Sequence, residues 1–156
     1  WLLIQSNSRF LTRLEFTSND LGYRDECLLI QASEEQILNY FEYKIQTFDV
    51  PIQYTGSEFE KRVWAETLKI PFGQTNSYEC IAKKIQMPTA VRAVGQAIRK
   101  NPIVIIIPCH RIIGKSGKLV GYVGGLDKKR ALLDREKKRD FDLFSRSHEF
   151  SYHSHL

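Results

Sequence analysis

The sequence predicts an α+β protein with a small N-terminal domain at 1–50, a linker at 51–56 and a mostly helical C-terminal domain at 57–136. Three observations predict this organisation. Short strand patterns gather near the N-terminus. Helical periodicity dominates after residue 57. Between them, Pro51 and Gly56 interrupt both patterns. The 156 residues suffice for one ordinary domain or two small ones.

The N-terminal domain is predicted to be a short antiparallel sheet with one helix. Leu2–Gln5 and Phe10–Phe16 are the candidate strands, and a polar turn joins them. Leu28–Ile30 is a weaker candidate for a third strand. Glu34–Ile45 is predicted to be a helix, because four apolar residues recur at helical spacing, namely Ile37, Leu38, Phe41 and Ile45.

The C-terminal domain is predicted to start with a capped helix. Ser57 and Glu60 form a capping box, in which each side chain satisfies a backbone N–H at the helix start. Pro71 ends this helix. Its apolar face should hold Phe59, Val63, Trp64 and Leu68.

A helix-turn-helix pattern follows. Ser77 can cap a short helix that runs to about Ile85, and Pro88 breaks the chain before a helix at 90–100. The inner face of this last helix carries Val91, Val94 and Ile98. Its outer face carries Arg92, Gly95, Gln96 and Arg99, with Ala93 and Ala97 beside them.

Gly95 is unusual because glycine inside a helix costs about 1 kcal/mol relative to alanine. Two explanations fit the sequence. Another backbone, such as a nucleic-acid strand, could approach the helix closely there. Alternatively, the glycine could allow two helices of this chain to pack tightly.

Charge is distributed unevenly along the chain. Residues 1–60 hold 4 Lys and Arg against 10 Asp and Glu, a balance of −6, whereas residues 61–156 hold 19 against 8, a balance of +11. This asymmetry fits equally well a surface that binds a polyanion such as nucleic acid and a basic surface that is merely solvated.

Neither a membrane protein nor a disulfide-stapled one is expected. The longest apolar run, 103–107, is far too short to span a bilayer. Three cysteines without C-x-x-C spacing argue against a disulfide framework or a cysteine zinc site (Cys27, Cys80 and Cys109). The first residues lack a signal-peptide pattern. We therefore expect an intracellular protein, cytoplasmic or, in a eukaryotic cell, nuclear.

Cys109 is the candidate nucleophile. It follows Ile103–Ile107, predicted to be a buried extended segment, and it directly precedes His110 and Arg111. A lone cysteine is usually a small buried hydrophobe. Here, an adjacent imidazole and nearby cations should favour the reactive thiolate, and we expect the sulfur to be exposed.

Several spaced motifs resemble one family. Ile107-Pro-Cys-His-Arg-Ile112 is preceded by Arg92-Ala-Val-Gly-Gln-Ala97 and Asn101-Pro102, and it is followed by Gly124-Gly125-Leu126. In this order, the motifs closely resemble the O6-alkylguanine-DNA alkyltransferases, over Phe59–Glu136. The resemblance implies a winged-helix-like DNA-binding domain behind a variable N-terminal α+β domain.

The resemblance implies direct-reversal repair of DNA without a cofactor. An alkyl group would pass irreversibly from O6 of a flipped-out guanine, and from O4 of thymine, to Cys109, so each molecule acts once. His110 would act as base through a water. Tyr78 matches a family tyrosine that hydrogen-bonds the purine, and Asn101 matches an asparagine that braces the segment carrying the cysteine.

Glu136 matches the carboxylate that orients the histidine in this family. The residues support this independently, because Glu136 shares the inward helix face of Leu132 and Leu133, and a buried carboxylate needs a partner. The alternative is a surface salt bridge with Lys128 or Arg139.

The implied partner is double-stranded DNA that contains O6-alkylguanine, bound by a monomer in the minor groove and largely independently of sequence. Arg92 would fill the gap left by the flipped nucleotide. The other residues expected to contact DNA are Ala93, Gly95, Gln96, Arg99 and Ser77. The expected substrate-pocket residues are Ile112, Tyr122, Val123 and Gly124.

Two features depart from the family pattern. Val123 stands where a small residue is usual, so we expect methyl lesions to be accepted more readily than larger adducts. The tail at 137–156 contains His148, His153 and His155, which could bind a metal, but we expect a disordered extension and no metal site.

A rival function is non-catalytic binding of alkylated DNA. Alkyltransferase-like proteins resemble the chain over the same region but lack the motif cysteine. Because Cys109 is present, we favour the enzyme. A general helix-turn-helix regulator would leave the Cys109 motif unexplained.

Overall fold

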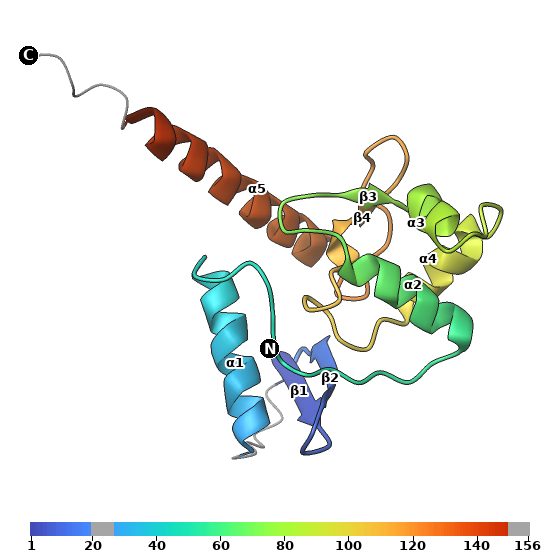
Figure 1. Ribbon diagram of the computed structural model, residues 1–156, viewed down its shortest axis with the longest axis horizontal. Coiled ribbons are helices and arrows are strands. Elements are labelled where there is room, and N and C mark those ends of the chain that lie inside the picture. Colours follow the sequence, from blue (N-terminus) through green and yellow to red (C-terminus); the bar gives the residue numbers. More distant parts are fainter. Residues whose placement is uncertain (20–26, 150–156) are drawn as a thin grey trace, which may run out of the picture.

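The computed structural model describes residues 1–19 and 27–149, with side chains through residue 137. Figure 1 shows the N-terminal strands and helix α1 beside a group of short helices, α2 to α4, with the long helix α5 extending away from both. The fold class is the predicted α+β. None of the helices in the described ranges is long and apolar enough to cross a membrane.

The N-terminal hairpin forms as predicted. Strands β1 (Leu2–Ser6) and β2 (Leu11–Phe16) pair antiparallel. The other edge of β2 contacts the rest of the chain through isolated bridges from Leu11 to Ile52 and from Leu14 to Ile103. One buried core therefore includes residues from both the N-terminal unit and the helical unit.

The predicted third strand is wrong. Leu28 begins helix α1 (Leu28–Phe41), whose buried residues recur at helical spacing, namely Ile30, Ser33, Ile37 and Tyr40. Because Ser33 and Tyr40 belong to this inward face, the sequence shows no purely apolar helical pattern from Leu28 onward. The helix stops short of Ile45, and Tyr43 has a positive φ of 61° in the turn that follows.

The three helices of the C-terminal unit match their predictions in position. Helix α2 (Glu58–Leu68) carries the complete capping box. Helix α3 (Tyr78–Lys84) begins after Ser77, whose hydroxyl accepts the Cys80 N–H. Helix α4 (Val91–Arg99) follows the turn. Two side chains differ from expectation, because Leu68 is exposed and Ala97 is buried.

The segment at 103–107 is buried as predicted but is not extended. Its chain turns, with Ile105 at a φ of 71°, and Ile107 N–H donates to Ile103 O. The Asn101 side chain accepts from Ile103 N–H and donates to Ile107 O, at 3.0 and 2.9 Å. These bonds satisfy backbone groups that a strand would pair with a neighbour, and so they favour the turn.

Two short elements bring the distant motifs together. Strand β3 (Asn76–Ser77) pairs in parallel with β4 (Ile112–Ile113), which directly follows the 3₁₀ turn Cys109–Arg111. The start of α3 is thus held beside the Cys109 motif.

Helix α5 (Leu126–Glu149) completes the described chain. It continues well beyond residue 136, so the part of the expected tail at 137–149 is helical. Its first turns pack on the 3₁₀ turn and bring Leu132, Leu133 and Glu136 into the interior. Residues 150–156, with His153 and His155, lie outside the described residues, as does the side chain of His148.

Candidate active site

Cys109 lies at the start of the 3₁₀ turn and is only 1% exposed. Its Sγ accepts a hydrogen bond from Asn101 Nδ2 at 2.9 Å. Burial raises the pKa of the thiol to about 11, although Asn101 and Lys129 act in the opposite direction. The expectation of an exposed, thiolate-favouring sulfur is therefore wrong: the closed site holds a neutral thiol near pH 7.

His110 is buried next to Cys109 and contacts helix α5. Its Nε2 lies 2.8 Å from Glu136 Oε1, as the sequence predicts. Its Nδ1 is buried without a hydrogen-bond partner among the described side chains and backbone. Burial lowers the pKa of His110 despite the carboxylate, so the imidazole is neutral near pH 7. With Nε2–H donating to Glu136, Nδ1 is left with a lone pair that can accept a proton.

The alternative of a surface salt bridge for Glu136 is wrong. The carboxylate is 1% exposed and accepts from Arg111 at 2.9–3.2 Å, from Tyr40 Oη at 2.7 Å and from Gly73 N–H at 3.0 Å, besides His110. Burial alone would raise its pKa, but the His110 and Arg111 bonds outweigh burial and hold the pKa at about 2. Glu136 is thus a fully hydrogen-bonded buried anion.

Lys129 provides a cation close to the thiol. The side chain is fully buried, and its ammonium donates to Ile112 O, Val120 O and Gly121 O at 2.6, 2.9 and 3.3 Å. Burial lowers the pKa of Lys129 to about 8, whereas Cys109 acts to raise it. Lys129 therefore tethers the segment at 120–121 and would stabilise negative charge that develops on the sulfur.

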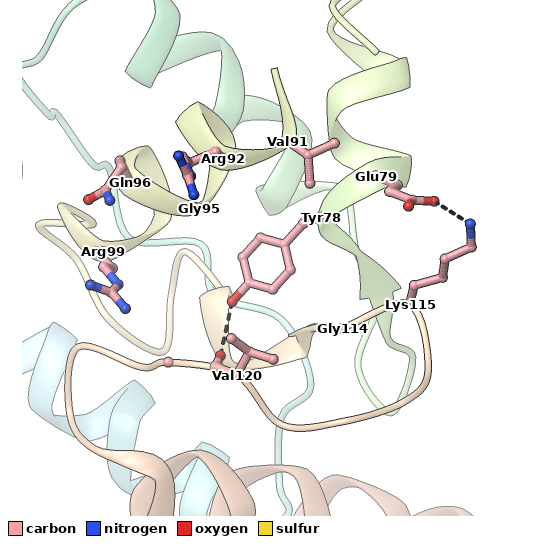
Figure 2. Close-up of a pocket in the computed structure, with 11 residues that line it drawn as sticks. Tyr78, Glu79, Val91, Arg92, Gly95, Gln96, Arg99, Gly114, Lys115 and Val120 are labelled. Carbon is pink, nitrogen blue, oxygen red and sulfur yellow. Dashed lines mark hydrogen bonds and ion pairs between the residues drawn. The ribbon is translucent and has the colours of Figure 1, made fainter. Parts of the chain in front are cut away.

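Tyr78 connects Cys109 to an open pocket. The pocket has a volume of about 380 Å³ and is lined by residues of α3, α4 and the segments at 114–115 and 120–121. Figure 2 shows the Tyr78 ring within it, with the hydroxyl donating to Val120 O at 3.0 Å. Burial and the neighbouring Cys109 raise the pKa of Tyr78, so its hydroxyl stays protonated.

The outer face of α4 forms one wall of this pocket, and Arg92, Gly95, Gln96 and Arg99 line it together. A Cβ on Gly95 would lie 4.0 Å from the Tyr78 ring. The glycine therefore faces the pocket, and the explanation by helix–helix packing is wrong. Ala93 is also exposed, whereas Ser77 uses its hydroxyl to cap α3.

The expected substrate-pocket residues do not all surround the sulfur. Ile112 is buried beneath the site, and the hydroxyl of Tyr122 is buried close to Cys109. Val123 is 47% exposed and does not line the described pocket. A Cβ on Gly124 would clash with Phe16 at 2.5 Å, so an N-terminal aromatic ring closes this side.

Comparison with known proteins agrees with the motif evidence. Residues 58–138 match the family model for the 6-O-methylguanine DNA methyltransferase DNA-binding domain. The chain belongs to this family. The curated methylated-DNA–protein-cysteine methyltransferase of Mycobacterium leprae is 40% identical over 141 residues, which cover 87% of this chain and 86% of that protein. The inducible enzyme of that name from Bacillus subtilis is 49% identical, over 69% of this chain and 60% of its own length.

Solved structures extend the likeness to the N-terminal unit. The structure of Mycobacterium tuberculosis OGT in complex with DNA matches with a TM-score of 0.81 and 42% identity, over 88% of this chain and 87% of that one. The O6-methylguanine methyltransferase of the same organism matches with a TM-score of 0.81 and 41% identity, over 92% of each chain.

Four residues of the candidate site were not found from the sequence. Arg111 belongs to the recognised motif, so its neighbours in sequence could have indicated it. Nothing in the sequence distinguishes Tyr40, Lys129 or Phe16 from other residues of their type, because only the folded chain brings them to the site. Within the described residues, no group of three or more His, Cys, Asp or Glu could hold a metal ion.

Proposed function

We propose that this chain repairs alkylated double-stranded DNA by transferring the alkyl group from O6 of guanine to Cys109, once per molecule. O4 of thymine is a second substrate position. The observation that carries the proposal is a buried group of three side chains. The Cys109 thiol directly precedes His110, whose imidazole is neutral and whose Nδ1 lone pair can accept a proton. The Glu136 carboxylate lies 2.8 Å from the other ring nitrogen of His110, Nε2.

The reaction needs a base because the thiol pKa is raised by burial. A water relays the thiol proton to His110 Nδ1, and Glu136 stabilises the resulting imidazolium. The sulfur then attacks the alkyl carbon in line. A C–S bond forms as the bond between that carbon and O6 breaks, and the electron pair of the broken bond stays on guanine. The guanine anion takes up one proton from water, and the His110 imidazolium returns to water the proton that it took from the thiol. The product thioether on Cys109 has no route back to thiol, which limits each molecule to one event.

Tyr78 stabilises the leaving base. Its protonated hydroxyl donates to Val120 O in this closed site, and in the complex it donates to the purine instead. Because Cys109 is almost fully buried, the residues that cover it must move aside before a guanine can reach the sulfur. We expect this movement in the segment at 120–121, since Val120 O accepts from the Tyr78 hydroxyl in the closed site. The base has to leave the duplex stack first, since its O6 is inaccessible there.

The exposed face of α4 binds the minor groove of the duplex, and the protein acts as a monomer. Arg92 and Arg99 line the pocket that contains Tyr78. We assign to Arg92 the filling of the gap that a flipped nucleotide leaves. Residues 61–156 carry a net charge of +11, and their lysines and arginines can contact DNA phosphates independently of the base sequence.

Repair stoichiometry tests this function. With excess duplex that carries one O6-methylguanine, the number of lesions removed should level off at one per protein molecule, because the thioether is not turned over. Continued turnover would contradict the proposal. Binding to the lesion without any repair would instead indicate the non-catalytic lesion binder.

Replacing Arg92 with alanine should slow repair of duplex DNA about tenfold or more, a loss of at least 1.4 kcal/mol. Reaction with the free base O6-benzylguanine should change little, because no nucleotide has to be flipped. The control is Arg9→Ala, which removes an exposed arginine from the N-terminal hairpin. Equal losses of Arg92→Ala on both substrates would rule out the assigned role.

A further inference from the structure

The Glu136 carboxylate receives a hydrogen bond from outside the helical unit. Tyr40 lies on α1, 96 residues away in sequence, and its hydroxyl donates to Glu136 Oε1 at 2.7 Å. This is the same oxygen that accepts from His110 Nε2 at 2.8 Å. Arg111 donates to this oxygen as well, from Nη2 at 2.9 Å and from Nε at 3.2 Å. Tyr40 is 1% exposed, so the donors from three residues share one oxygen in a site without bulk solvent.

The Tyr40 hydroxyl is held in place by aromatic packing. Three rings surround it, with centroid distances of 5.4 Å to Phe41, 5.4 Å to Phe48 and 5.9 Å to Phe72. Phe72 directly precedes Gly73, whose N–H donates to the other carboxylate oxygen of Glu136. The ring has little freedom to rotate away, and the position of the hydroxyl is therefore set by the N-terminal core.

A hydrogen bond donated to Oε1 reduces how strongly that oxygen stabilises a protonated His110. The hydrogen bond from Tyr40 withdraws negative charge from Oε1 and leaves less of it to stabilise an imidazolium. It also fixes the orientation of the carboxylate relative to Nε2. Both effects require a tyrosine hydroxyl, which phenylalanine removes while the ring packing remains.

We propose that Tyr40 is a positioning residue for alkyl transfer: through Glu136 Oε1 it orients His110 and limits how readily the imidazole takes a proton, which makes the N-terminal unit part of the catalytic machinery. This inference rests on the proposed function, because it assigns a role within the same reaction. The hydrogen bond also links the packing of α1 to the protonation of the base.

Several charged or titratable groups surround His110 and define the electrostatic setting. Helix α5 contributes Glu136 and Lys129, and the 3₁₀ turn contributes Cys109 and Arg111. Tyr122, from the segment before α5, faces both Cys109 and Glu136. Tyr40→Phe changes none of these groups and leaves their charges in place, so any shift in the titration of His110 reports the lost hydroxyl.

The test is the Tyr40→Phe variant of the full chain. The transfer rate to free O6-benzylguanine falls as pH is lowered and His110 takes up a proton. In the variant, the midpoint of this fall should move upward by about half to one pH unit, equivalent to a several-fold slower rate below the midpoint. Tyr54→Phe is the matched control, since Tyr54 makes an edge-to-face contact with Trp64 and is not part of the Glu136 network.

An NMR titration of the His110 imidazole provides a readout that does not need activity. The pKa of His110 should rise in Tyr40→Phe and stay unchanged in Tyr54→Phe. An unchanged His110 titration in folded Tyr40→Phe, with at most a lower melting temperature, would show that Tyr40 is only structural and overturn the inference. Absence of transfer in the wild-type protein would instead refute the proposed function and leave this titration interpretable.

Discussion

Replacing Glu136 with glutamine should both destabilise the protein and slow alkyl transfer by about 100-fold or more. The variant leaves the buried Arg111 guanidinium without its counter-charge, and breaking one partner of a buried pair typically costs about 3–5 kcal/mol. For a chain of this size, that corresponds to a drop in melting temperature of about 10 °C. The rate falls because His110 loses the anion that stabilises its protonated form.

The pH dependence of stability provides a second signature of Glu136. Its folded-state pKa of about 2 lies below the ordinary value of 4.5. The carboxylate therefore contributes stability fully above pH 4.5, and this contribution is lost as pH falls toward 2. Glu136→Gln should remove that part of the acid sensitivity, as seen in unfolding free energies measured across this range.

A surface glutamate is the matched control. Glu58 forms an exposed ion pair with Lys61, and Glu58→Gln should change stability by less than about 0.5 kcal/mol and leave the rate unchanged. Glu136→Asp keeps the charge with a shorter reach, so partial recovery of activity would separate loss of chemistry from loss of fold. Wild-type stability and rate in Glu136→Gln would refute the role assigned to the buried network.

Replacing Cys109 with serine should abolish repair and leave the fold intact. Serine keeps the size and can still accept from Asn101, but its hydroxyl is a far weaker nucleophile than a thiol. The variant should still bind duplex DNA that carries the lesion. Cys80→Ser changes a half-buried cysteine on α3 and should repair at the normal rate. Any residual repair by Cys109→Ser would contradict the assignment.

Local signals in the sequence were enough to place helices α2 to α4. The capping box at Ser57 and the Ser77 cap predicted where α2 and α3 begin, because caps depend on a few adjacent residues. The contact between His110 and Glu136 was implied by the family resemblance, and the helical face of Leu132 and Leu133 supported the burial of the carboxylate. Leu28–Ile30 was misassigned because three apolar residues in a row fit a strand and a helix turn equally well.

The ionisation state of the site could not be predicted from neighbours in sequence. Adjacent basic residues suggested a thiolate, but the pKa of Cys109 depends on its burial, which only the tertiary structure sets. Tyr40 and Lys129 reach the site from elements distant in sequence, and their own surroundings in the chain resemble ordinary helix positions. The bent backbone at 103–107 likewise depends on bonds from Asn101.

The fate of the alkyl group is the most direct measurement. The protein is incubated with a duplex that carries one O6-methylguanine and digested with trypsin, and the peptide at 101–111 is weighed. It should gain the mass of one CH₂ on Cys109 in proportion to the lesions lost, while the peptides containing Cys27 and Cys80 stay unchanged. Loss of lesions with an unmodified Cys109, or a methyl group on either other cysteine, would contradict this account.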